Sequence, residues 1–250
     1  DIHKTIKKNI PDKKNSPGQY RNHLVYVGDT SNGGIYKPPK ILKDIQDLMS
    51  CFIDWIHSEE LTSLDPFIRA FLAHYYLCII HPFGDGNGRT ARLLEGIILQ
   101  TAGNKYLPRQ LSNYYYSNID DYYIAISKSL KNKNDNTPFL AFCAEGAVKS
   151  LKFIKSKIIF YIRKLTLKDF YGFERKNKRL TARQYELLIL LLDNPEYFTL
   201  KDLQTKIPFS LLYSKVTSQT ARRDLNKLYH RRFLDRDDNG KYFLNIGILD

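Results

Sequence analysis

The residues best suited to chemistry lie together between His81 and Arg92, in the segment His-Pro-Phe-Gly-Asp-Gly-Asn-Gly-Arg-Thr-Ala-Arg. His81 is a base that can take a proton from an attacking hydroxyl. The carboxylate of Asp85 supplies the hard oxygen ligands that magnesium prefers when it bridges phosphates. Arg89 and Arg92 are three residues apart, so on a helix they share a face from which two guanidinium groups bind neighbouring phosphates. Together these residues predict phosphoryl or nucleotidyl transfer.

Two helices are predicted to position this segment. Asp65 is typical of an N-cap and is followed by proline at the first helical position, and the apolar spacing after it predicts a helix that ends at Ile80. A second, largely buried helix is predicted to begin near Asn87 or Gly88. The glycine-rich loop therefore lies at a helix N-terminus, where free backbone N–H groups and the positive end of the helix dipole bind anions.

The same residues also have a purely structural interpretation. A single histidine before proline is most often structural, alternate glycines form turns, and an arginine pair often covers a solvated helix face. The glycine spacing fits neither the Rossmann pattern, which needs glycine where Arg89 stands, nor the P-loop, which needs Gly-Lys followed by Ser or Thr. The complete set of residues favours the chemical interpretation.

At every specified position the segment resembles the signature of the Fic family, His-Pro-Phe-x-x-Gly-Asn-Gly-Arg-x-x-Arg. The resemblance implies a mainly α-helical core with a small β-hairpin flap. It also implies binding of ATP and Mg2+ and transfer of AMP to the hydroxyl of a Ser, Thr or Tyr side chain of a protein, with release of pyrophosphate. Removal of AMP from a modified protein, or transfer of another phosphate-containing group, stays open as an alternative.

The resemblance also implies roles for individual residues of the signature. His81 would be the general base, Asp85 the magnesium ligand and Phe83 a packing anchor. The residues that would bind the ATP phosphates are Gly86, Asn87, Gly88, Arg89 and Arg92, with Arg92 as the partner of the terminal phosphate.

A hairpin flap is predicted before the signature. Strand-like residues 20–27 and 35–36 flank the turn-forming segment 29–34. The resemblance implies that the flap docks the target protein along its edge by strand addition, which satisfies the backbone without demanding one side-chain sequence. The docking residues would be Gly34, Ile35 and Tyr36. An ordinary surface hairpin is the alternative.

Paired tyrosines, Tyr122 and Tyr123, lie in a tyrosine-rich segment after the signature helix. Members of the Fic family often carry paired aromatic residues near the nucleotide, so the resemblance implies a contact with adenine or ribose. Packing in the core is the more usual role of aromatic residues at helical spacing.

Helix caps and charge predict two domains joined by a linker. The catalytic domain, with an N-terminal arm and the flap, is predicted over residues 1–165, a basic linker over 166–180, and a winged helix-turn-helix domain over 181–250. The winged helix rests on caps at Thr181, Thr199 and either Thr217 or Ser218, and on a hairpin turn at Asn239-Gly240. Such a module binds duplex DNA or docks protein, so a DNA-binding regulator is the alternative function.

The whole chain has a net charge of +13 over 250 residues, which favours polyanion partners such as nucleotide, nucleic acid or acidic protein surfaces. A second copy of the chain, in a homodimer, is a further partner to test. The three cysteines form no Cys-x-x-Cys pair and indicate buried, reduced thiols. No apolar run reaches the roughly 18 to 20 residues that cross a bilayer, so the chain is expected to be soluble, cytoplasmic and without a membrane partner.

The resemblance is incomplete where regulation is concerned. Many members of the family carry an inhibitory helix, Ser/Thr-x-x-x-Glu-Gly/Asn, whose glutamate pairs with the second signature arginine, here Arg92. The nearest segment, Ala141 to Gly146, contains Glu145 but lacks the hydroxyl residue. Because the chain opens without methionine, inhibition is expected from missing upstream residues or from a partner, unless the chain is constitutively active.

Overall fold

The structure, a computed structural model, describes residues 2–8, 10, 16–28, 30–31, 33–132 and 135–249. The chain divides into two compact units, Asp1–Lys155 and Ser156–Asp250. It is mainly helical, as the sequence predicts. In chain order the elements are α1 (Ile2–Ile6), α2 (Leu42–Ile56), α3 (Glu59–Thr62), α4 (Pro66–Ile80), α5 (Asn87–Thr101), α6 (Leu107–Ser117), α7 (Ile119–Lys131), α8 (Thr137–Lys176), α9 (Ala182–Asp193), α10 (Leu200–Thr205), α11 (Ser210–Tyr213), α12 (Ser218–His230), β1 (Leu234–Arg236) and β2 (Tyr242–Leu244).

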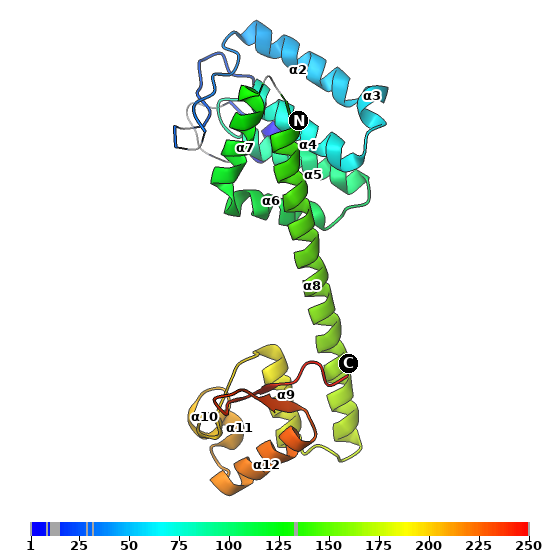
Figure 1. Cartoon of the computed structure of the whole chain (residues 1–250), viewed down its shortest axis with the longest axis vertical. Helices are drawn as coiled ribbons and strands as arrows, with labels where there is room; N and C mark the ends of the chain where they lie inside the picture. The colour runs from blue at the N-terminus through cyan, green and yellow to red at the C-terminus, as the bar shows by residue number, and fades with distance from the viewer. Residues whose placement is uncertain are drawn as a thin grey trace. The chain divides into compact units, whose positions relative to one another are not determined.

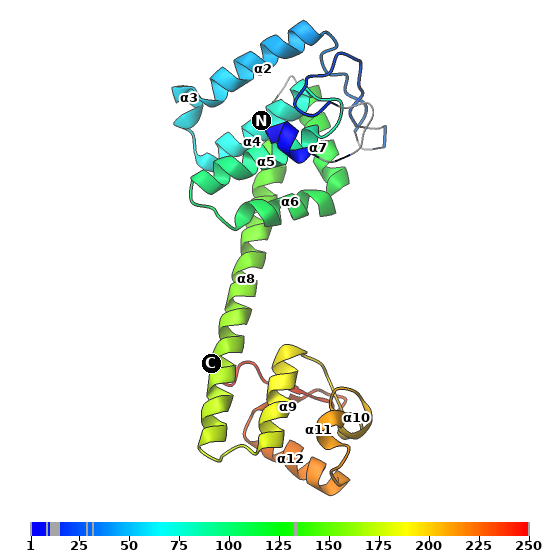
Figure 2. The ribbon, with the colours of Figure 1, turned by 180° about the vertical axis from the view of Figure 1, so that it is seen from behind.

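The N-terminal unit is built around the pair α4 and α5, which the signature loop connects (Figure 1). Helix α2 packs on α4, α6 packs on α5, and the short α1 lies against α5, as the reverse view shows (Figure 2). The core that these helices enclose is rich in aromatic residues. Its largest fully buried side chains include Ile45, Phe71, Tyr75, Tyr115 and Phe139.

Helix α4 has the bounds that the sequence predicts. The Asp65 carboxylate accepts a hydrogen bond from the Phe67 N–H (2.8 Å), and Pro66 occupies the first turn, where its missing N–H costs nothing. The helix ends at Ile80 because His81 adopts the left-handed conformation, with φ 49°. The predicted second helix, α5, begins at Asn87 and is also confirmed.

A buried polar network joins four helices of this core. The imidazole of His74 on α4 is fully buried and pairs through Nδ1 with the Glu95 carboxylate on α5. Its Nε2–H donates to the Tyr122 hydroxyl of α7 (3.0 Å), and the Tyr115 hydroxyl of α6 donates to Glu95 (3.1 Å). Burial is the largest single effect and lowers the pKa of His74, but the Glu95 carboxylate and the Cys78 side chain together outweigh burial and raise that pKa to about 9. His74 is therefore a cation in the folded core.

The apolar stripe along α2 is only partly buried, since Ile45, Met49 and Phe52 face α4 while Leu48 and Ile53 are exposed. The cysteines differ in part from the sequence prediction. Of the three cysteines expected to be buried, Cys78 and Cys143 are buried, whereas Cys51 on α2 is exposed. In the part of the chain that the structure describes, no helix is both long and apolar enough to cross a membrane.

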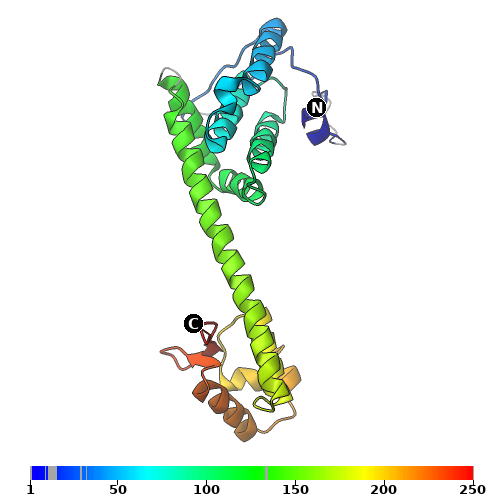
Figure 3. The same cartoon turned by 90° about the vertical axis from the view of Figure 1, so that its right-hand side faces the viewer.

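The C-terminal unit places α9 to α12 before a two-stranded antiparallel sheet. Strand β1 pairs with β2 in the register Leu234↔Leu244, and β1 contacts α12, so that hairpin and helix lie side by side (Figure 3). The predicted caps are confirmed, because the side chains of Thr181, Thr199 and Thr217 each accept a hydrogen bond from the backbone N–H three residues later. Assignment of this unit to the winged-helix class stays a prediction.

The predicted linker, residues 166–180, is not a separate segment. Helix α8 continues to Lys176, and its side chains Leu167 and Tyr171 are buried in the core of the C-terminal unit. The division between the two compact units falls at 155/156, ahead of the predicted boundary. The loop after β1 also differs from a two-residue turn: the Asp237 carboxylate accepts hydrogen bonds from the N–H groups of Asn239 (3.1 Å) and Lys241 (2.7 Å).

Candidate functional site

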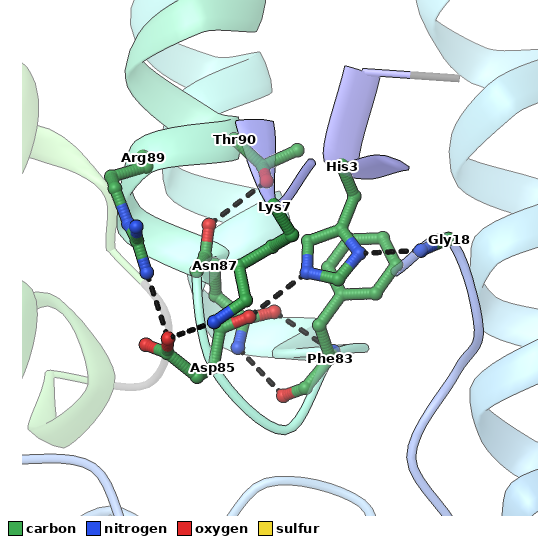
Figure 4. A network of polar contacts seen from close by, with 9 residues as sticks. His3, Lys7, Gly18, Phe83, Asp85, Asn87, Arg89 and Thr90 are labelled. Carbon is green, nitrogen blue, oxygen red and sulfur yellow. Dashed lines mark hydrogen bonds and ion pairs between the residues drawn. The ribbon is translucent and has the colours of Figure 1, made fainter. Parts of the chain in front are cut away.

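The signature loop between α4 and α5 is closed by one buried side chain. The Asn87 amide accepts a hydrogen bond from the Phe83 N–H (2.9 Å) and donates to the Phe83 carbonyl (2.7 Å) (Figure 4). Gly86 precedes α5 with φ 88°, a conformation that favours glycine. The side chain of Asn87 therefore shapes the loop and does not itself face a phosphate, in contrast to the role predicted from the sequence.

His81 lies at the end of α4 with its ring partly exposed. Its Nδ1 is 3.3 Å from the Cys78 carbonyl oxygen, and donation of Nδ1–H to that oxygen leaves Nε2 as the proton acceptor. Burial lowers the pKa of His81 to about 4, against the smaller opposing effect of the Cys78 hydrogen bond. At neutral pH the ring is therefore uncharged, as a general base must be.

Arg21 supports His81 and was not singled out by the sequence. Its side chain is 3% exposed, and its guanidinium donates to the carbonyl oxygens of His81 (2.7 Å), His23 (2.8 Å) and Pro39 (2.6 Å). Its own N–H donates to the Pro82 carbonyl (2.9 Å). One buried cation thus ties the chain on both sides of the flap to the end of α4. A single arginine in an irregular segment gives no local signal of that role.

The N-terminus of α5 offers backbone donors to an anion. The first hydrogen bond of the helix runs from the Thr90 N–H to the Gly86 carbonyl (2.9 Å). The N–H groups of Asn87, Gly88 and Arg89 therefore have no acceptor within the helix. The Arg92 guanidinium lies over this turn, because a Cβ added at Gly88 would stand 3.3 Å from an Arg92 nitrogen. Backbone donors, the helix dipole and a cation therefore meet at one place.

Two cations among the described residues contact Asp85. Its Oδ2 is 2.7 Å from a terminal nitrogen of Arg89 and 2.7 Å from Nζ of Lys7, which comes from the helical turn after α1. The Lys7 hydrogen bond is the largest of the effects that keep the pKa of Asp85 below its usual value. The carboxylate is still about half exposed (52%) and stays ionised at neutral pH.

The residues present fit a magnesium ion bound through one carboxylate. Asp85 offers an ionised, accessible oxygen ligand beside the predicted phosphate site, and magnesium commonly takes one or two carboxylates with the rest of its shell from phosphates and water. Among the described residues no cluster of three or more His, Cys, Asp and Glu side chains could hold a metal alone. Asp85 would therefore be the protein's ligand in a site completed by the nucleotide.

The predicted flap contains one β-bridge in its described part. Val27 and Tyr36 exchange backbone hydrogen bonds of 3.0 and 2.8 Å. Residues 29 and 32 of the predicted turn lie outside the described residues. The Gly33 carbonyl accepts hydrogen bonds from Ser127 (2.5 Å) and Lys131 (2.5 Å), so α7 holds the flap.

The three predicted docking residues follow that anchor. Gly34 and Tyr36 are partly exposed and Ile35 is 53% exposed. Tyr36 and Pro39 also line an apolar groove of about 410 Å³ with side chains of α2 and α4.

The two predicted nucleotide contacts from α7 have different environments. Tyr122 is 3% exposed, and its hydroxyl bonds to His74 and to the Cys78 sulfur, so its ring lies in the core instead of facing a nucleotide. Tyr123 is partly buried and packs against the core from its edge. Neighbouring helix positions point about 100° apart, so a pair of adjacent tyrosines does not share one surface.

Comparison with known proteins agrees with the sequence signature. Residues 1–99 match the model of the Fic/DOC family. Proteins named protein adenylyltransferase Fic, from Drosophila willistoni and Drosophila mojavensis, are each 40% identical over 136 residues, which is 54% of this chain and 24% of the relative. The chain thus spans about a quarter of the length of these curated relatives (24%).

The fold has a counterpart among solved structures. A Fic family protein from Desulfovibrio desulfuricans G20 aligns with a TM-score of 0.53 over 97% of this chain and 66% of its own, at 20% sequence identity. At that identity the likeness concerns the fold alone. Family model and sequence relatives agree that residues 1–99, which lie in the N-terminal unit, are similar to the Fic/DOC family.

Proposed function

We propose that the chain is a protein adenylyltransferase, which transfers AMP from ATP to the hydroxyl of a Ser, Thr or Tyr side chain of another protein. The observation that carries the proposal is the complete signature folded around the N-terminus of α5, with a neutral base, an anion site and an ionised carboxylate. The names of the Drosophila relatives support the choice of AMP as the transferred group.

In this reaction Nε2 of His81 takes the proton of the attacking hydroxyl. The hydroxyl oxygen forms a bond to the α-phosphorus of ATP, the bond between that phosphorus and the oxygen bridging to the β-phosphate breaks, and pyrophosphate leaves. The N–H groups at the start of α5 stabilise the charge that develops on the phosphate oxygens. Arg92, which lies over the same turn, would hold the terminal phosphates.

Magnesium would bind to Asp85 and would neutralise phosphate charge in the bound nucleotide. The target segment would lie along the flap at Gly34, Ile35 and Tyr36, where added backbone hydrogen bonds place a hydroxyl near His81 without requiring one target sequence. Removal of AMP from a modified protein is the alternative reaction: a water oxygen would bond to the phosphorus, the bond to the side-chain oxygen would break, and AMP and the free hydroxyl would be released. Loss of label from a protein that already carries labelled AMP would detect it.

The test is transfer of label from ATP labelled at the α-phosphate to protein, in the purified chain and in a lysate. Wild type is expected to label protein, and His81→Ala to lose labelling while it still binds ATP. His57→Ala, which changes an exposed histidine at the end of α2, is the matched control and should label normally. Labelling that survives in His81→Ala would refute the role of His81 and with it the proposed chemistry.

We infer a second, separate function for the C-terminal unit, namely binding of duplex DNA by a winged helix. Helix α12 exposes Arg222 and Arg223, and a polar pocket beside them is lined by Arg222, Asn226 and Arg236 from helix and hairpin. Binding should weaken steeply with salt, since phosphate contacts release counterions. A gel shift that shows no binding, or binding unchanged in Arg222→Gln/Arg223→Gln, would contradict this function and favour protein docking.

A further inference from the structure

Lys7 is a buried cation placed directly on the carboxylate of the signature loop. Its side chain is 2% exposed, and Nζ lies 2.7 Å from Oδ2 of Asp85 (Figure 4). Lysine is almost never buried without a partner, because removing an ammonium from water is costly. An apolar side chain would fill the same space without that cost. Asp85 is therefore a counterpart of the Lys7 charge among the described residues.

His3 fixes the helix that carries Lys7. The His3 ring stacks on Phe83 with ring centres 3.7 Å apart and planes within 5°. Its Nε2–H donates to the Asp85 carbonyl (2.9 Å), and its Nδ1 accepts from the Gly18 N–H (2.9 Å). His3 and Lys7 are four residues apart, so one face of α1 and its following turn presents both side chains to the loop.

Gly86 makes this close approach possible. A Cβ added at Gly86 would stand 3.3 Å from Nε2 of His3 and 3.5 Å from Cδ of Lys7. The stem of Lys7 therefore passes over the residue that precedes α5, and its ammonium reaches Asp85 from the side of the helix N-terminus. The signature glycine accommodates the N-terminal helix as well as the backbone conformation of the loop.

We propose that Lys7 is an internal cation that competes with a divalent metal for the Asp85 carboxylate. The inference rests on the proposed function in one respect, namely that Asp85 is the metal ligand. Arg89 contacts the same oxygen at 2.7 Å, so two positive side chains already face the carboxylate. A metal ion about 2 Å from either carboxylate oxygen would lie within a few ångströms of Nζ, where repulsion between unscreened charges is strong.

Metal binding is consequently coupled to the position of α1. When the metal arrives, the Lys7 ammonium withdraws from Asp85, and the contact between α1 and the loop weakens. Coupling between two binding events is reciprocal, so anything that holds α1 in place lowers metal affinity, and anything that displaces α1 raises it. The N-terminal helix thereby sets how readily the site accepts its metal.

The test measures Mn2+ binding, by electron paramagnetic resonance of the free ion, in the presence of α,β-methylene ATP, which cannot release pyrophosphate. Lys7→Met keeps the unbranched stem and removes the charge, and it should bind Mn2+ at least about tenfold more tightly than wild type. Lys4→Met removes the same charge from an exposed position of α1 and should leave the affinity unchanged. Lys7→Arg keeps a cation and should stay as weak as wild type.

Equal or weaker Mn2+ affinity in Lys7→Met overturns the proposal, as does tightening of similar size in Lys4→Met or Lys7→Arg. In an Asp85→Asn background, wild-type Lys7 and Lys7→Met should bind Mn2+ with the same affinity. A difference in affinity that persists would place the metal elsewhere and would also overturn the proposal. Circular dichroism checks that each variant is folded. Failure of AMP transfer is a separate result, because labelling is measured on wild type with excess magnesium, whereas the Mn2+ comparison needs no turnover.

Discussion

The buried pair of His74 and Glu95 should make the stability of the N-terminal unit depend on pH in a defined window. The folded-state pKa of His74 is about 9, against 6.5 for an ordinary histidine. Between these values the folded chain holds a proton that the unfolded chain has lost, so stability falls as pH rises. At about 1.4 kcal/mol for each pKa unit, the loss amounts to about 3 kcal/mol.

Glu95→Gln is the informative change, because it keeps the shape of the side chain and removes the charge. Near pH 6 it should lower the free energy of unfolding by about 3 to 5 kcal/mol, since it leaves a buried cation unpaired. Above pH 9, where His74 is neutral in wild type as well, the difference between the two proteins should be much smaller.

Trp55 provides the assay. It is the chain's single tryptophan, and it packs against the N-terminal core and edge-on to Tyr76. Urea unfolding followed by Trp55 fluorescence therefore reports on this unit by itself. Parallel stability curves for wild type and Glu95→Gln from pH 6 to 9.5 would refute the reasoning, because they would show that the pair does not hold a proton on His74.

Two further predictions concern the signature loop. Because burial lowers the pKa of His81 to about 4, kcat/KM for label transfer should stay level between about pH 5.5 and 7, and an inflection near 6.5 would contradict a neutral, buried base. Asn87→Ala leaves the Phe83 N–H and carbonyl without partners and should lower stability by about 1 to 3 kcal/mol and weaken ATP binding. Asn113→Ala, at an exposed position of α6, is its control in thermal melting, and equal melting temperatures would remove the role given to Asn87.

Local signals account for what the sequence predicts correctly. Asp65 and Pro66 are enough to predict the start of α4. Each helix cap in the C-terminal unit is formed by a threonine and the N–H group three residues later, so it too can be predicted from adjacent residues. Lys7 and Arg21 were missed because their partners lie far along the chain, 78 residues away for Asp85 and 60 for the His81 carbonyl. A local pattern carries no information about such contacts. The spacing of Ile2 and Ile6 was the available hint that a helical turn carries His3.

The basic side chains of the segment predicted as a linker, residues 166–180, form ion pairs that the sequence does not reveal. Within this segment Arg175 pairs with Glu186 (3.3 Å) and Arg179 with Glu174 (3.1 Å), and Lys164, just before it, pairs with Asp193 (2.9 Å). These cations support α8 and the C-terminal unit through pairs whose acidic members come largely from other segments. A local count of charges registers the run of lysines and arginines but not their acidic partners, which lie largely in other segments. It therefore does not show that the fold uses these charges in ion pairs.

The two signature arginines illustrate the same point at the site itself. Both arginines belong to the signature and are three residues apart, so the sequence predicts that both bind phosphate. In the fold they contact different groups. Arg89 is engaged with Asp85 at 2.7 Å, whereas Arg92 has no acidic partner among the described residues and lies over Gly88 at the start of α5. Arg92 can therefore meet an incoming phosphate without breaking an ion pair. Arg89 can do so only as Asp85 gains another cation, which links its contribution to the competition between Lys7 and the metal.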